Sequence, residues 1–396
     1  MTTTPSTARD MDDMIAWLSD MRRREPVSFD ERTGRWHVFQ YEDARRVLTD
    51  FTVFSNDLSA FIPENEALEA FQKGNFQGMD PPRHRHLRGL VSQVFTPRFV
   101  AGLRPRLEAV TTELLDAVRD QDEFDLIADL AYPLPVIVIA EVLGVPAEDR
   151  SMFQNWASTM LVDNGVDAIL SEAGVEAMVP VINEMNEYLL AHIRRHRARP
   201  DDGLISKLLA VEEEGRRLGD QEIIGFLSLL LVAGHLTTTA LLGNSVMCLG
   251  RNSAAAADLR ADPSLSDSMI EEVLRYRSPF PWVDRVTKQN VAIGGREIPE
   301  GVMVDVWISS ANRDPEVFSD PELFDIRRAP NHHLAFGKGI HFCLGAPLAR
   351  LETKVALGQL LDRYPRLVVP PEEQIEYHDP YSMQGVKRLP LTVVPA

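Results

Sequence analysis

The chain has only two cysteines, Cys248 and Cys343, among its 396 residues. They lie far apart in the sequence, and neither belongs to a CxxC pair. Disulfide frameworks and structural zinc sites need several closely spaced cysteines, so both are excluded. The first residues, MTTTPSTARDMDDM, lack the basic and apolar segments of a secretory signal peptide. We therefore expect a protein of the reducing cytoplasm.

Basic residues are also scarce, with 41 Lys and Arg against 59 Asp and Glu, which gives a formal net charge of −18. Nucleic acids and anionic membranes attract clustered positive charge, so this balance argues against both as partners. The acidity is typical of a protein that is kept soluble by its charge.

Linkers are missing too, because the chain has no Gly/Ser run, no low-complexity segment and no fixed-period repeat. Apolar residues make up 44% of the chain, which is enough for a substantial buried core. We expect residues 1–396 to form a single domain.

One long run, Ile223 to Gly250, contains no Asp, Glu, Lys or Arg. Its length is sufficient to cross a bilayer. It also contains polar residues such as Ser228, His235 and Asn244, which are costly in lipid. A helix that is apolar on all sides is more typical of the core of a large soluble domain, and we predict no membrane span.

The apolar spacing predicts a mainly α fold with a small, segregated β region. Helical periodicity dominates from about Arg83 to Tyr276 and returns from Cys343 to about Leu361. Strand patterns occupy residues 25–29 and 35–39, and they reappear between Val286 and Ile308.

A Gly-rich loop, Phe336 to Gly345, leads directly into the last predicted helix, with Cys343 at its mouth. Glycines permit close approach of a planar ligand to the backbone. A helix N-terminus lowers the pKa of a cysteine and favours the thiolate, which is the form that binds metals. The dinucleotide fingerprint G-x-G-x-x-G fails because position 342 is Phe. Cys248, in an apolar helix, is interpreted as a small buried hydrophobe.

The pattern Phe336-x-x-Gly339-x-x-x-Cys343-x-Gly345 resembles the haem-binding signature of the cytochrome P450 superfamily, and particularly of soluble bacterial enzymes of macrolide and other secondary metabolism. The resemblance implies haem b, with Cys343 as the iron ligand and the haem buried between the long distal helix and the cysteine-loop helix. It further implies a monooxygenase that hydroxylates or epoxidises an organic substrate. A thiolate behind haem iron favours cleavage of the O–O bond.

Two further segments match the proximal side of that family. Glu272 and Arg275 share a helix face and resemble the ExxR motif, a buried structural pair; the alternative is an ordinary exposed ion pair. The resemblance implies that a later arginine, Arg313 or Arg328, joins them. Haem propionates need cationic or donor partners. The residues that match the family's propionate partners, each otherwise a surface cation, are His84, Arg88, Arg285 and His341.

The long uncharged run carries Ala233-Gly234-His235-Leu236-Thr237-Thr238, which resembles the family's oxygen-binding motif. Ala233 and Gly234 leave room for oxygen and substrate, and the hydroxyls of Thr237 and Thr238 are the catalytic candidates. For Thr237, a hydrogen bond to the backbone carbonyl four residues earlier is an alternative that would bend the helix.

Leu236 departs from the family pattern, which places Asp or Glu at this position for proton delivery. We hypothesise that Thr237 and bound waters carry the protons, helped by His235 or by a substrate hydroxyl. A rival interpretation is a haem-thiolate enzyme that uses peroxide or catalyses another oxidation. A non-catalytic haem carrier or sensor is a third, and the small residues next to Thr237 argue against it.

The resemblance also implies where substrate and redox partners bind. The pocket is expected to involve the loop Phe54–Gly78 and the turns at Phe280–Val283 and Ser382–Val386, with Ala233, Val283 and Met383 as lining residues. We expect a medium or large, mainly apolar substrate and a monomeric enzyme. No flavin or nicotinamide site is visible, so electrons would come from a ferredoxin and its reductase. A basic spot of Lys338, Arg350 and Lys354 is the predicted docking site.

Overall fold

The computed structural model describes residues 11–160, 168–213 and 215–394. Contacts between Cα atoms divide the chain into two compact units. Unit 1 combines Met1–Asn56, Thr111–Ala131 and Thr237–Ala396, whereas unit 2 combines Asp57–Val110 and Tyr132–Leu236. Two helices, α6 (Arg104–Ala117) and α11 (Asp220–Arg251), contain residues of both units. The single domain expected from the sequence stays a prediction.

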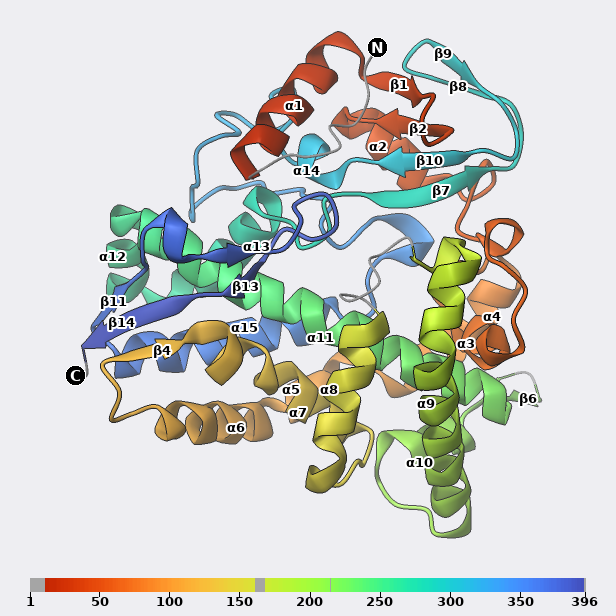
Figure 1. The fold of residues 1–396 in the computed structure, drawn as a ribbon, viewed down its shortest axis with the longest axis horizontal. Coiled ribbons are helices and arrows are strands. Elements are labelled where there is room, and N and C mark those ends of the chain that lie inside the picture. The colour runs from red at the N-terminus through yellow and green to blue at the C-terminus, as the bar shows by residue number, and fades with distance from the viewer. Residues whose placement is uncertain (1–10, 161–167, 214, 395–396) are drawn as a thin grey trace. The chain divides into compact units, whose positions relative to one another are not determined.

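Unit 1 contains a five-stranded sheet with the order β1-β2-β10-β7-β3 (Figure 1). Its strands are β1 (Val27–Asp30), β2 (Arg35–Val38), β10 (Met303–Val306), β7 (Val283–Thr287) and β3 (Phe54–Ser55). β2 and β10 are parallel, and the other neighbours are antiparallel. The N-terminal strand pair predicted from the sequence is present, and it joins strands from the C-terminal part of the chain.

The helices of unit 1 follow the apolar periodicity of the sequence. In α13 (Ser266–Tyr276), the apolar residues Met269, Ile270, Val273 and Leu274 recur at helical spacing and are buried. The other helices of the unit are α1 (Met11–Arg24), α2 (Tyr41–Thr49), α12 (Ser253–Ala261), α14 (Ile308–Ala311) and α15 (Ala346–Arg363).

Three smaller sheets complete unit 1. They are β11-β14-β4, β12-β13 and β8-β9, made of β4 (Glu123–Asp125), β8 (Val291–Ile293), β9 (Arg296–Ile298), β11 (Arg366–Val368), β12 (Glu376–Tyr377), β13 (Val386–Arg388) and β14 (Pro390–Val394). The described strands are short and pair with one another in these sheets, as expected for a mainly α protein with segregated strands.

Unit 2 is almost entirely helical. Its helices are α3 (Glu69–Gly74), α4 (Arg83–Val94), α5 (Pro97–Gly102), α7 (Pro133–Val142), α8 (Arg150–Ser158), α9 (Glu172–Ala198) and α10 (Leu204–Ala210). Ser171 caps α9, because its hydroxyl accepts a hydrogen bond from the backbone N–H of Gly174. A short hairpin, β5 (Glu212–Glu213) with β6 (Arg216–Arg217), interrupts the region that the sequence predicts as helical.

The uncharged run of the sequence lies in α11. This helix is long and apolar enough to cross a membrane, but 78% of its most apolar window is buried inside the protein. Part of this burial comes from close contact with α3, where a Cβ added to Gly225 would lie 2.3 Å from the carbonyl oxygen of Ala70. α11 therefore has the burial of a core helix, as its polar residues predicted.

The segment Phe54–Gly78, expected to be a long loop, contains several short elements instead. It begins with β3, continues through three 3-10 turns (Ser59–Phe61, Glu66–Leu68 and Phe76–Gly78) and includes α3. Asn65 and Asn75 cap two of these turns, since each side chain accepts a backbone N–H two residues later. Such local caps produce no long apolar period, so the sequence pattern did not reveal them.

The segment between α14 and α15 is irregular, and a buried carboxylate holds it. Glu272 accepts two hydrogen bonds of 2.8 Å from Arg275, and both side chains are 0% exposed. Arg328 donates from Nε to both Glu272 oxygens at 3.2 Å. The backbone N–H of Asp325 and the amide of Asn331 donate to the same carboxylate. The predicted pair is therefore buried, and Arg328 is the arginine that joins it.

Arg313, the alternative third arginine, has other partners. Its guanidinium lies 4.2 Å from the centre of the Tyr276 ring and donates to the Tyr276 carbonyl oxygen at 2.9 Å. It also forms an ion pair with Glu322. Arg313 thus fixes the end of α13, one turn beyond Glu272.

We predict that Arg328→Gln lowers the free energy of unfolding by about 3 kcal/mol, because it removes one partner of a buried carboxylate. Arg327→Gln is the matched control. The ion pair of Arg327 with Asp258 is about half exposed on both sides, so its loss should cost about 0–1 kcal/mol. Urea titrations followed by circular dichroism measure both values. Equal effects of the two substitutions would contradict the bracing role.

Candidate functional site

The cysteine loop is anchored at both of its ends. The backbone N–H of Cys343 donates to the carbonyl oxygen of Phe336 at 2.9 Å, which closes the loop on itself. The N–H of Leu334, just before the loop, donates to the side-chain oxygen of Asn312 at 2.7 Å. The Asn312 amide in turn donates to the hydroxyl of Ser278. Cys343 therefore lies in a loop whose backbone positions are fixed by hydrogen bonds.

Two glycines shape this loop. Gly337 and Gly339 have φ angles of +68° and +74°, in the left-handed region that favours glycine. A Cβ on Gly339 would also lie 3.1 Å from the carbonyl oxygen of Leu48, so α2 passes close to the loop. Gly345, the third predicted glycine, lies beside the cysteine, where an added Cβ would be 3.9 Å from the Cys343 Sγ.

The sequence predicts a helix that opens near Cys343, and α15 is that helix. It begins at Ala346, so Leu344 and Gly345 separate it from the cysteine. The N–H groups of Leu348 and Ala349 bond to the carbonyl oxygen of Gly345, which starts the helical ladder there. Pro347, early in the helix, has no N–H to donate and fits a first turn.

The long helix α11 has one accessible stripe. Between Ile223 and Leu249, every residue is buried except Leu230, Ala233, Gly234 and Thr237. Residues three and four positions apart share a helix face, so these four form a single line. Three of them are residues that the sequence singled out for oxygen and substrate. Thr238, the second predicted catalytic hydroxyl, is buried beside the stripe with 5% of its surface exposed.

Gly234 has a packing role besides the room predicted for it. A Cβ at this position would lie 2.6 Å from the Cδ1 atom of Ile139 on α7. A side chain there would require Ile139 to shift, so the glycine permits α7 to approach the stripe closely. Gly234 therefore combines small size with tight packing.

His235 and Leu236 lie on the buried side of α11. His235 is 0% exposed, and its ring centre lies 4.2 Å from that of Tyr132. Burial lowers the pKa of His235 to about 3, although a hydrogen bond with the Tyr132 backbone opposes this shift. Leu236 is 3% exposed. His235 is thus uncharged at neutral pH, and Leu236 has no proton to offer.

The four predicted propionate partners divide between the units. His84 and Arg88 are one turn apart on α4 in unit 2, whereas Arg285 on β7 and His341 belong to unit 1. His84 is 3% exposed, and burial, with Arg88 nearby, lowers its pKa to about 4. A neutral His84 would act as a hydrogen-bond donor. Arg285 is 6% exposed and donates to the Asp284 carbonyl oxygen at 2.5 Å.

The predicted pocket residues of unit 1 come from two turns. Val283 opens β7 and is half-buried, while Met383 is 5% exposed and lies in the turn before β13. The neighbouring Gln384 is tied to α11, because the amide of Asn244 donates to its carbonyl oxygen at 2.8 Å. The backbone N–H of Gln384 donates to the carbonyl oxygen of Pro279.

The predicted basic spot is largely neutralised. Arg350 donates to both carboxylate oxygens of Glu271 at 2.6 and 2.7 Å and lies 4.5 Å from the centre of the Phe336 ring. Lys354 donates to Asp267 at 2.7 Å. Within the described chain, Lys338 is the member of this spot without an ion pair, and it is exposed. Arg350 thus supports the cysteine loop through Phe336, a role that the sequence did not indicate.

Glu352 on α15 is a further residue that the sequence analysis missed. Its side chain is 1% exposed, and neither carboxylate oxygen has a hydrogen-bond partner among the described residues. Burial alone raises its pKa to about 8, so the folded protein holds it as a neutral acid. The sequence signal for the burial of Glu352 was its position one helical turn after the apolar Leu348.

We predict that Glu352→Gln stabilises the protein at neutral pH. The unfolded chain loses the Glu352 proton near pH 4.5, whereas the folded chain keeps it up to about pH 8, so stability falls as pH rises between these values. Replacing the acid with an amide removes this dependence. We expect a gain of about 1–3 kcal/mol at pH 7.5 and almost none at pH 4.

Urea unfolding at both pH values measures this gain, and Glu373→Gln at an exposed position is the control. A variant that loses stability equally at both pH values would show that Glu352 is ionised in the folded protein.

Comparisons with known proteins place this arrangement in a family. Residues 32–393 match the family model described as cytochrome P450. The chain is 43% identical to the cyclomarin C epoxidase CymV of Salinispora arenicola, over 94% of each chain. It is 42% identical to the erythromycin C-12 hydroxylase of Saccharopolyspora erythraea, over 96% of this chain and 94% of the relative.

Solved structures agree with the sequence relatives. A mutant of P450 EryK in complex with erythromycin B matches with a TM-score of 0.88 and 41% identity, over 96% of both chains. CYP109E1 from Bacillus megaterium, free of substrate, matches with a TM-score of 0.90 and 39% identity, over 96% of this chain and 99% of that one. The chain therefore belongs to the cytochrome P450 family, and the predicted haem-thiolate oxidoreductase class is confirmed at the level of the family.

Proposed function

We propose that this cytochrome P450 inserts one oxygen atom from O2 into a medium or large, mainly apolar secondary metabolite, by hydroxylation or epoxidation. Cys343 would hold the iron of haem b, and the observation that carries the proposal is the cysteine loop itself. Its hydrogen-bonded backbone and left-handed glycines present Cys343 three residues before the start of α15. The relatives whose names specify an epoxidase of cyclomarin C and a hydroxylase of erythromycin support the substrate class.

The described residues fit a haem group. The accessible stripe on α11 consists of an apolar side chain, two small residues and one hydroxyl. Such a stripe would suit the flat, largely apolar face of a haem, which has a polar centre at the iron. His84, Arg88, Arg285 and His341 would supply donors to the propionates. When bound, thiolate-ligated haem supplies the activation of dioxygen. The protein's own contribution is to orient the substrate and to deliver protons.

Proton delivery must proceed without an acid at Leu236. His235 is uncharged and faces the buried side with Tyr132, so it is a poor proton donor at neutral pH. Thr237 is the hydroxyl on the accessible stripe. We therefore favour the route through Thr237 and bound waters over one through His235, with Thr238 as a second hydroxyl. Use of peroxide as the oxidant is the alternative function, and the side chain of Leu236 is the observation that favours it.

We predict that Thr237→Ala raises the peroxide released per electron pair consumed by about tenfold, as expected for loss of a positioned proton donor. Thr239→Ala is the control, since its hydroxyl points away from the stripe and donates to the Ala131 carbonyl oxygen at 3.0 Å. Comparing a reductase-driven with a peroxide-driven reaction separates the two functions. The peroxide route would be favoured if Thr237→Ala released no more peroxide per electron pair than the wild type and if turnover with peroxide were faster than turnover with the reductase.

Electrons would come from a ferredoxin and its reductase, as typical of soluble bacterial members of the family. Of the three basic residues predicted to bind the ferredoxin, Lys338 remains the candidate, because it is exposed whereas Arg350 and Lys354 are paired with acids. We further propose that residues 1–396 act as one domain, as a monomer in the cytoplasm.

The thiolate assignment has a direct test. The carbon monoxide difference spectrum of the reduced wild-type protein should show the absorption band of a thiolate-ligated haem, and Cys343→Ala should lose that band. Cys248→Ala, a buried cysteine with a raised pKa, should keep it. A Cys343→Ala protein that retains the band would overturn the assignment. Absorption titrations with a compound library would then identify substrates by the shift of the haem spectrum.

A further inference from the structure

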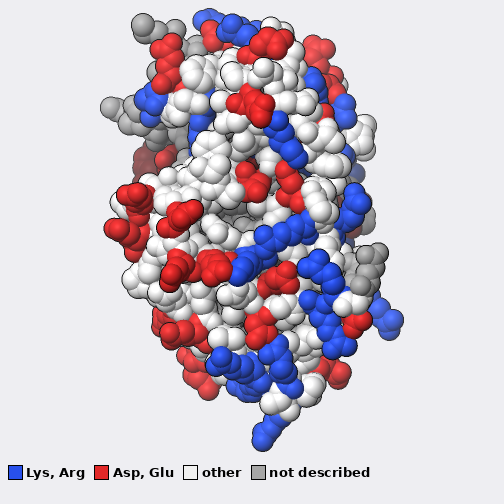
Figure 2. All heavy atoms as spheres, turned by 90° about the vertical axis from the view of Figure 1, so that its right-hand side faces the viewer, with Lys and Arg blue, Asp and Glu red and all other residues white. Residues whose placement is uncertain are grey.

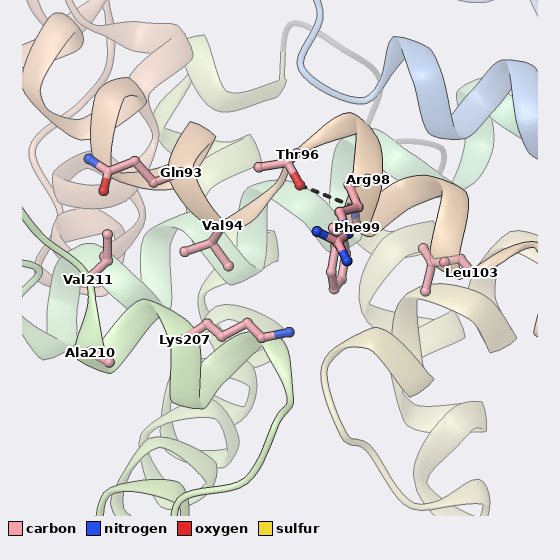
Figure 3. Close-up of a pocket in the computed structure, with 10 residues that line it drawn as sticks. Gln93, Val94, Thr96, Arg98, Phe99, Leu103, Lys207, Ala210 and Val211 are labelled. Atoms are coloured by element: carbon pink, nitrogen blue, oxygen red, sulfur yellow. Dashed lines mark hydrogen bonds between the residues drawn. The ribbon is translucent and has the colours of Figure 1, made fainter.

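A pocket lies in unit 2, on elements that do not carry the cysteine loop. It has a volume of about 710 Å³ and lies between the end of α4, helix α5 and the end of α10 (Figure 3). Its walls are apolar, formed by Val94, Phe99, Leu103 and Val211. Small-molecule sites in proteins have volumes of roughly 300–1,000 Å³. The pocket is thus large enough for an organic ligand.

Two cations line this pocket without an acid to balance them. Arg98 and Lys207 are exposed, and Figure 3 shows both head groups directed into the opening. None of the lining residues is Asp or Glu, although the chain has 59 acidic against 41 basic residues. Among the described residues, neither cation takes part in an ion pair. An anion between them would relieve their repulsion.

The surroundings of the pocket increase its attraction for anions. On the face drawn in Figure 2, Lys and Arg side chains gather toward the lower end, where α9 and α10 lie. The last turn of α9 carries Arg195 and Arg197, of which Arg197 is paired with Asp220. A local excess of positive charge on an acidic protein steers anionic ligands toward that face.

A smaller cavity of about 280 Å³ adjoins the pocket and shares Phe99 and Leu103 with it. Its other apolar residues include Val138 and Leu204. Its cation, Arg106, is already paired, because it donates to both oxygens of Glu141 at 2.7 Å. The unpaired charge is therefore confined to the first pocket, and the second offers an apolar recess.

Gly102 keeps the first pocket open. It is the last residue of α5, and a Cβ added to it would meet no atom within 4 Å. Glycine weakens a helix relative to alanine, and here no neighbouring atom requires it. A larger side chain at this position would extend into the pocket.

The geometry points to a binding site for an alkyl carboxylate, such as a medium-chain fatty acid. Its carboxylate would lie between Arg98 and Lys207, and its chain would follow Val94, Phe99 and Leu103 toward the apolar recess. Arg98 supplies planar donors that suit a carboxylate, and the Lys207 ammonium, 5.5 Å from the Phe99 ring centre, supplies a second charge. None of its lining residues belongs to the predicted substrate pocket, and the proposal does not depend on the proposed function.

Calorimetric titration of the full-length haem-loaded protein with decanoate tests the site. An excess of 4-phenylimidazole keeps decanoate away from the haem, and the haem spectrum monitors this. We expect one saturable site, at least tenfold weaker binding of decyltrimethylammonium, and no saturable binding of acetate. These ligands separate the contribution of the carboxylate from that of the chain.

Matched variants locate the binding. Arg98→Gln combined with Lys207→Gln should weaken decanoate at least tenfold, while Arg194→Gln combined with Arg199→Gln, exposed cations that do not line the pocket, should weaken it far less. Gly102→Leu should weaken binding by placing a side chain where the ligand would lie. Gly358→Leu, at another helical glycine with open space, is its control.

An unchanged affinity in the Arg98/Lys207 double variant or in Gly102→Leu would overturn the proposal, as would equal binding of the two decyl compounds. Circular dichroism and the carbon monoxide spectrum show whether each variant is folded, so a loss of binding in a folded variant is specific to the pocket.

Discussion

The carboxylate of Glu272 lies in the interior of unit 1, and a buried charge is stable only when partners supply its hydrogen bonds. Arg275 and Arg328 supply the charge, and the backbone of Asp325 with the amide of Asn331 supplies further donors. Because these partners come from α13 and from the irregular segment after α14, the carboxylate ties a loop without regular structure to a helix. The position of the cysteine loop, which follows this segment, depends on that tie.

Further contacts connect α13 and the irregular segment to the cysteine loop. Arg350 pairs with Glu271, the neighbour of Glu272 on α13, and covers the ring of Phe336. Asn312 holds the backbone just before Phe336. Helix α13 thus presents two adjacent acids, Glu272 bonded to the irregular segment and Glu271 bonded both to His333 of that segment and to Arg350 of α15. A thiolate ligand requires such a rigid support, because its position relative to the metal determines the site.

Burial determines the charge of the titratable groups near the candidate site. His84, His235 and Glu352 are each almost fully buried, and desolvation shifts the pKa of each toward its neutral form. The long helix adds no acid at Leu236. The chain therefore combines an acidic composition with neutral groups at these buried positions, and Thr237 carries the accessible hydroxyl within Ile223–Leu249 of α11.

The sequence by itself determined the family, the cysteine loop, the core character of α11 and the ExxR pair, because each depends on residues close together in the chain. Only the tertiary structure decided that Arg328 joins Glu272 while Arg313 pairs elsewhere, since no sequence pattern distinguishes the two arginines. It also revealed the roles of Arg350 and Asn312, the neutral Glu352, the caps at Asn65 and Asn75, and the pocket at Arg98 and Lys207. These depend on contacts between distant segments or on short local turns, which leave no periodic pattern in a single sequence.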